Sequence, residues 1–140
     1  MKLKLVRVLG AIMSLLPIPS LALAQPIQLS GPPYSLGMDL GAAVLGKSLA
    51  APFQLRATAD RIQALVGQSV YTEISQYAVG SNPHAVGNYV VEQVCQPHFC
   101  TNAARIVFDH QGNTWIATTA GQGWLWYGNP PADVVSIFPE

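Results

Sequence analysis

The sequence predicts an α+β domain: one antiparallel meander sheet of about five strands, with a helix packed on one face and a short C-terminal helix. Apolar residues recur at steps of three and four before Gly67, and at steps of two after it. Short stretches rich in turn-forming residues separate the period-two segments. Connections of that length leave no room for crossover helices, so neighbouring strands should run antiparallel.

The first residues have the features of an export signal. Three basic residues lie within the first seven positions, and an apolar segment too short to span a membrane unaided follows them. Ala22-Leu23-Ala24 then provides the pattern that signal peptidase accepts. We therefore expect a signal peptide over residues 1–24, cleavage after Ala24 and a periplasmic protein. The alternative is a buried N-terminal helix, which Pro17 and Pro19 would break.

The remaining residues, 25–140, are enough for one domain. Without Lys2, Lys4 and Arg7, four basic residues stand against seven acidic ones, which gives a net charge of about −3 with His neutral. So few cations provide no electrostatic footprint for nucleic acid. No later segment is long and apolar enough to cross a bilayer. We expect neither a nucleic-acid partner nor a membrane span.

The helical elements come first in this domain. Residues 25–37 contain three prolines and little periodicity, which predicts an extended or poorly ordered arm. The pattern is helical over 38–66, where Pro52 can open a helix and Gly67 can end it. The apolar positions of that helix are Leu55, Ala59, Ile62 and Leu65 or Val66.

The strands follow the helix. Turn-forming stretches at 81–84, 110–113 and 121–123 divide them. Asn129 as N-cap and Pro130 as first helical residue predict the short C-terminal helix. The expected strands span about 70–79, 88–94, 104–109, 114–120 and 123–127.

Cys95 and Cys100 fall between two predicted strands, at the tip of a hairpin. In an exported chain an even number of cysteines favours a disulfide. The four intervening residues are too many for a tight turn, so the bond would hold them as a rigid protrusion. Pro97 fixes one more backbone angle, and His98 should lie near the apex. Such preorganised loops bind well because their ordering cost is met during folding.

The segment Cys95-Gln96-Pro97-His98-Phe99-Cys100 resembles the loop of the inhibitor of vertebrate lysozyme (Ivy) family, whose members are exported by Gram-negative bacteria. In that family the loop enters the lysozyme cleft, and its histidine meets the two catalytic carboxylates. The similarity covers about 89–107, and the family's five-stranded antiparallel sheet with helices matches the predicted strands. The better-known members have Lys before the Pro and Asp after the His, where this chain has Gln96 and Phe99.

The resemblance implies a lysozyme inhibitor whose inhibitory loop residues are Gln96, Pro97, His98 and Phe99. Lysozyme cleaves with a protonated glutamic acid and an ionised aspartate. A protonated imidazole between them can donate to both, and a neutral one can occupy the donor and acceptor positions of the acid. The expected partner is a c-type lysozyme or a related peptidoglycan lytic enzyme, and a homodimer is left open.

Other interpretations of the same residues stay open. The cysteines can form a merely structural staple, or bind zinc with His98 and His110, and His98 can be an ordinary exposed turn residue. Trp124 and Trp126 share a sheet face, which is either covered by a helix or the binding face of a periplasmic structural or glycan-binding module. The sequence contains no catalytic set, phosphate loop or metal-binding helix motif, so we expect no enzyme and no cofactor.

Overall fold

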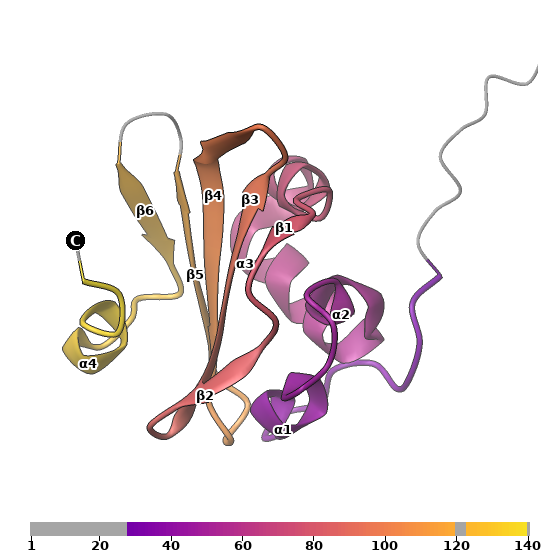
Figure 1. Ribbon diagram of the computed structural model, residues 1–140. Coiled ribbons are helices and arrows are strands. Elements are labelled where there is room, and N and C mark those ends of the chain that lie inside the picture. The colour runs from indigo at the N-terminus through magenta and orange to yellow at the C-terminus, as the bar shows by residue number, and fades with distance from the viewer. Residues whose placement is uncertain (1–27, 120–122, 140) are drawn as a thin grey trace, which may run out of the picture.

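The computed structural model describes residues 28–119 and 123–139, so the predicted signal peptide and its cleavage site lie outside the described residues. Six strands within these ranges form one sheet, with helices on both of its faces (Figure 1). The predicted α+β class, with its antiparallel sheet and short C-terminal helix, is confirmed. The helices are α1 (Leu40–Val44), α2 (Ala51–Gln54), α3 (Arg56–Ile74) and α4 (Ala132–Val135), and the strands are β1 (Val79–Gly80), β2 (His84–Val86), β3 (Tyr89–Gln96), β4 (Phe99–Phe108), β5 (Thr114–Thr119) and β6 (Trp124–Tyr127).

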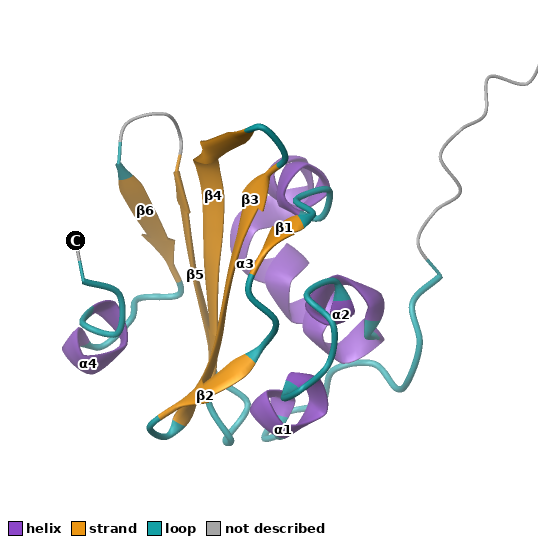
Figure 2. Ribbon diagram, in the orientation of Figure 1, coloured by secondary structure: helices purple, strands orange, loops and turns teal. Residues whose placement is uncertain are grey.

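The sheet is a meander from β3 to β6, and every pairing in it is antiparallel. Two short strands share the outer edge of β3: β1 pairs near Cys95, and β2 pairs near Tyr89. β6 forms the opposite edge of the sheet (Figure 2). The β3–β4 hairpin is the longest pairing, and its tip lies at the same end of the sheet as β1.

Successive side chains of β3 point to opposite faces of the sheet, and the apolar residues accordingly form two cores. Val90 and Val94 belong to a core with residues of α1, α2 and α3, whereas Val91 belongs to a second core with Val134 of α4. α4 lies on the other side of the sheet from α1, α2 and α3 (Figure 1). The second core consists of Val91, Val107 and Val134, with aromatic side chains packed around them. The main core contains Leu40, Val44, Phe53, Ala57, Ile62, Val66, Ile74, Tyr77, Val90, Val94, Ala104, Ile106, Phe108 and Ile116.

The predicted helix from Pro52 to Gly67 is divided in the structure. The backbone is extended at Leu55, between α2 and α3, where Leu55 bridges to Ser30. The main chain of Ser30 bonds to both neighbours of Leu55, so this part of the predicted N-terminal arm is extended and attached to the helices. Gly67 interrupts α3 with a φ of 82°, as its predicted role as a helix end requires.

The helix nevertheless resumes after Gly67 and continues to Ile74, so the predicted strand over 70–79 is wrong. Only Val79–Gly80 (β1) pairs as a strand within that range. Val66, Val70 and Ile74 recur every four residues and pack in or against the main core. Burial at helical spacing therefore outweighs the strand propensity of these side chains.

Two smaller differences concern the ends of elements. β2 begins at His84, within a stretch predicted to be a turn. α4 begins at Ala132 after Pro131, two residues beyond the predicted start, because Asn129 has a φ of 54° and is not part of the helix. In the described parts of the chain, no helix combines the length and the hydropathy needed to cross a membrane.

Candidate functional site

The hairpin between β3 and β4 ends in a two-residue turn. Gln96 pairs with Phe99, so Pro97 and His98 form the apex. The expectation that the loop is too long for a tight turn is wrong, because strand pairing continues beyond the cysteines. His98 has a φ of 66°, in the left-handed region. Proline followed by a residue with positive φ is typical of a type II turn.

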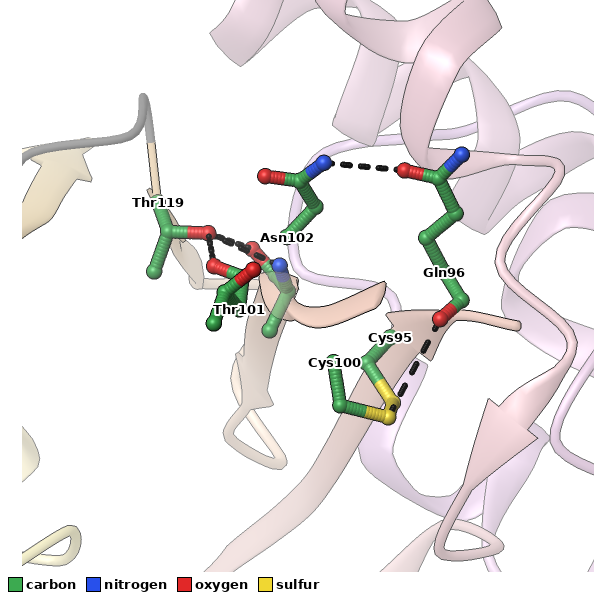
Figure 3. The surroundings of a disulfide bond; sticks show 7 residues. Cys95, Gln96, Cys100, Thr101, Asn102 and Thr119 are labelled. Carbon is green, nitrogen blue, oxygen red and sulfur yellow. Dashed lines mark hydrogen bonds between the residues drawn. A yellow bond between two sulfur atoms is a disulfide. The ribbon is translucent and has the colours of Figure 1, made fainter. Parts of the chain in front are cut away.

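Cys95 and Cys100 are joined by a disulfide, with their Cα atoms 4.8 Å apart (Figure 3). Cys95 is buried in the sheet, whereas Cys100 is exposed. Because both sulfurs are in the bond, neither is a thiolate of the kind that zinc binds. Within the described residues, no group of three or more His, Cys, Asp or Glu is arranged to hold a metal ion.

A bulge lies behind the turn, on β4. Cys95 pairs with Ala103 while Gln96 pairs with Phe99, so residues 100–102 have no partner on β3. Thr119 of β5 holds this bulge, since its Oγ1 accepts from the Ala103 N–H at 2.8 Å and donates to the Thr101 carbonyl at 2.7 Å (Figure 3). These contacts were not predicted, because the bulge that creates them has no sequence signal.

Gln96 is held from the same bulge. The Asn102 amide donates to Gln96 Oε1 at 2.9 Å, and the two side chains face each other in Figure 3. Gln96 and Asn102 lie on the sheet face that also carries Val94 and Ala104, which is the face covered by α3. The Gln96 side chain is therefore fixed on the α3 side of the tip.

His98 and Phe99 are exposed at the tip, whereas Pro97 is half-buried. Phe99 has 60% of its surface accessible to solvent, and no described residue hydrogen-bonds to the His98 imidazole. The other histidines differ in this respect. His84 Nδ1 lies 2.9 Å from the Asn82 carbonyl, and His110 Nδ1 lies 2.8 Å from Asp39 Oδ1. His98 and His110 lie at opposite ends of β4, so the structure does not bring them together.

A cavity of about 350 Å³ lies between the hairpin tip and the end of α3. The hairpin contributes Gln96 and Pro97, the last turn of α3 contributes Glu73, and the residues just after the helix contribute Gln76 and Tyr77. The Tyr77 hydroxyl donates to Glu73 Oε1 at 2.9 Å. Burial, together with this bond to Glu73, raises the pKa of Tyr77 to about 12. Sequence analysis missed this cavity because it assigned the Tyr77 segment to a strand.

The tryptophans of β6 lie against the C-terminal segment. Trp126 and Phe138 have ring centroids 6.3 Å apart, and Trp126 packs against the second core. The Arg105 guanidinium lies over both Trp124, 3.8 Å from the ring centroid, and Phe138, at 4.7 Å. This packing agrees with the interpretation of the tryptophans as a helix-covered sheet surface.

One carboxyl group lies inside the main core. Glu92 of β3 is 0% exposed, and its oxygens have no hydrogen-bond partner among the described residues. Burial raises the pKa of Glu92 to about 9. Its position between Val90 and Val94 in the period-two pattern is a signal that identifies it as inward-facing.

Comparison with protein-family models, with curated proteins and with solved structures gives no match for this chain. The chemical properties of the tip follow from its own residues. They form a projection closed by a disulfide, with an exposed imidazole at the apex and an aromatic ring beside it. Such a projection can enter a concave site and form hydrogen bonds at its base.

Proposed function

We propose that this protein inhibits lysozyme by inserting the hairpin tip, with His98 at its apex, into the active-site cleft. The observation that carries the proposal is the exposed His98 imidazole on a two-residue turn that a disulfide closes. The resemblance of Cys95-Gln96-Pro97-His98-Phe99-Cys100 to the Ivy loop supports the same target.

The physical argument concerns the two catalytic carboxylates of lysozyme. An imidazole that lies between them forms hydrogen bonds with both, and the sugar then has no access to the acid. Because the tip is ordered before binding, little conformational entropy is lost when it enters the cleft. Phe99 adds exposed aromatic surface next to the imidazole, suited to an apolar part of the cleft.

The location that we propose is the periplasm. The disulfide between Cys95 and Cys100 is compatible with an oxidising compartment. The sequence pattern up to Ala24 is typical of an export signal. A periplasmic inhibitor would meet lysozymes that attack the cell wall, with a c-type lysozyme or a related peptidoglycan lytic enzyme as the target.

The test is inhibition by the purified protein and by His98→Ala. Interface energy concentrates in a few central residues, and truncation of His98 leaves two enzyme carboxylates unpartnered in a partly desolvated cleft. We expect His98→Ala to weaken binding by about 2 kcal/mol or more, which is roughly thirtyfold in affinity. Inhibition constants from cell-wall turbidity assays against c-, g- and i-type lysozymes measure this effect.

His84→Ala and His110→Ala are the controls, because both residues lie away from the tip. Each should change the binding free energy by less than about 0.5 kcal/mol. If the unmodified protein inhibits none of the enzymes, lysozyme inhibition is wrong. If it inhibits one of them and His98→Ala inhibits equally well, the loop mechanism is wrong.

A further inference from the structure

We infer that the cavity between the hairpin tip and α3 binds an arginine side chain of the partner protein. The inference rests on the proposed function, since it identifies a second contact made when the tip is inserted. Gln96 and Pro97 line the cavity and also flank or form the apex, so a partner that surrounds His98 reaches the cavity as well.

The charge of the cavity favours a cation. Among the described residues, Glu73 is the one charged residue that lines it, and one of its carboxylate oxygens accepts a hydrogen bond, from the Tyr77 hydroxyl. The second oxygen has no hydrogen-bond partner among the described residues. The side-chain carbonyl of Gln76 can provide a further acceptor at the rim. A ligand with several N–H donors and a positive charge matches this set.

The shape favours a guanidinium over an ammonium group. Tyr77 lines the cavity, and planar guanidinium groups pack against aromatic side chains more readily than ammonium groups do. A guanidinium also presents five N–H donors in a fixed fork, which suits a carboxylate next to an amide. The volume of about 350 Å³ lies at the lower end of the range for small-ligand sites.

The arginine must come from another molecule. The cations of residues 28–119 and 123–139 do not line the cavity. Arg61 lies over the Tyr34 ring, and Arg105 lies over Trp124. The excess of acidic residues in 25–140 further favours encounter with a cationic partner.

A second cavity of the same volume offers a comparison. It lies beyond the other end of β4 and is lined by Tyr89, Asp109 and His110, among others. There the Asp109 carboxylate already accepts from the N–H groups of Gln111 and Asn113 and from the Asn113 side chain. The Tyr89 hydroxyl is likewise bonded, to Asp133. Glu73, by contrast, has one carboxylate oxygen with no hydrogen-bond partner among the described residues, and this oxygen can accept a hydrogen bond from a ligand.

The first experiment measures binding to a c-type lysozyme that the protein inhibits. Glu73→Gln keeps the size of the side chain and removes its charge, whereas Asp60→Asn removes one charge from an exposed position on the same helix. We expect Glu73→Gln to weaken binding about threefold to fivefold, because Glu73 is exposed, and the loss should shrink at high salt. Asp60→Asn should leave the affinity unchanged. Equal affinities for both variants would overturn the inference.

The second experiment needs no lysozyme. N-acetyl-argininamide is titrated into the protein and followed by amide NMR, with N-acetyl-lysinamide as the comparison ligand. We expect shifts at Gln76, Tyr77 and Gln96 with the arginine probe, smaller shifts with the lysine probe, and none in Glu73→Gln. Absent shifts, or equal shifts in that variant, would overturn the arginine site. Shifts in a protein that inhibits no lysozyme would uphold the site and contradict the proposed function.

Discussion

His98 combines an exposed imidazole with a backbone conformation that few side chains adopt. Its φ of 66° lies in the left-handed region, which costs roughly 1–2 kcal/mol for a residue with a Cβ atom. Such conformations persist where the surrounding structure enforces them, and they are frequent at functional sites. Here the Gln96–Phe99 pair and the disulfide enforce the turn.

Because of this conformation, two substitutions of His98 should differ in stability but not in inhibition. Glycine adopts a positive φ without steric cost, so we expect His98→Gly to be about 0.5–1 kcal/mol more stable than His98→Ala. Both variants lack the imidazole and should lose inhibition alike. Urea unfolding and the turbidity assay measure the two effects.

The control for this comparison is His84, which lies in β2 without a positive φ. There the order should reverse, with His84→Gly less stable than His84→Ala by roughly 0.5–1 kcal/mol. If His98→Gly were no more stable than His98→Ala, the turn would not require a left-handed residue.

Among the elements, the strands of the meander were predicted well and the helices only in part. β3 and β5 are rich in β-branched and aromatic residues, which identifies them as strands, but buried residues occur on both of their faces, so alternation alone does not assign those faces. The segment after Gly67 contains Val70, Tyr71 and Thr72, whose types favour strands. The segment is helical because its side chains pack against the main core. The propensities of single residues carry no information about such packing.

The hairpin tip shows a similar division. A disulfide was predicted from the even number of cysteines, and His98 was predicted to lie near the apex; the disulfide is confirmed. The length of its turn was not predicted correctly, because the bulge at residues 100–102 changes which residues pair. The side chain that holds this bulge, Thr119, comes from a different strand. Contacts between distant segments of this kind leave no local pattern in the sequence.

The next prediction concerns the disulfide of the β3–β4 hairpin. The disulfide closes a short loop, so replacing Cys95 and Cys100 together by Ser should cost at most about 2 kcal/mol of stability. We expect the variant to fold, because the β3–β4 pairing and the Thr119 bonds remain, but to inhibit more weakly because its tip is less ordered. Thermal unfolding and inhibition constants test this.

Wild-type protein treated with a reductant provides the comparison, and its inhibition should fall to that of the double variant. Intact mass should also show the oxidised protein two hydrogen atoms lighter than the reduced one. Two titratable thiols in periplasmically expressed protein would contradict the disulfide-closed tip. Undiminished inhibition by the variant would mean that strand pairing alone orders the tip.

The stability of the whole molecule depends on a carboxyl group that the proposed function does not use. Glu92 lies in the main core, where ionisation would place an unpaired charge among apolar side chains. Its pKa of about 9 in the folded protein is far above the ordinary 4.5. Desolvation is the cause of this shift.

The direction of the pH dependence follows from whether the folded and the unfolded protein hold the Glu92 proton. Between pH 4.5 and about 9, the unfolded chain has lost the Glu92 proton while the folded protein keeps it. Folding then takes up a proton, so the free energy of unfolding falls by up to about 1.4 kcal/mol for each pH unit across this window. From pH 4.5 to 7, the decrease amounts to about 3 kcal/mol.

Glu92→Gln keeps the shape of the side chain and removes its ionisation. We expect the variant to match the wild type near pH 4.5 and to be about 3 kcal/mol more stable at pH 7, as measured by urea unfolding. Asp39→Asn should lower the free energy of unfolding at neutral pH, which is the opposite of the effect of Glu92→Gln, because the hydrogen bond from the Ala42 N–H lowers the pKa of Asp39 below 3.8. Its carboxylate stabilises the fold above that pKa, and the contribution disappears as the pH falls through it. A constant difference between Glu92→Gln and the wild type from pH 4.5 to 8 would contradict a protonated Glu92 in the core.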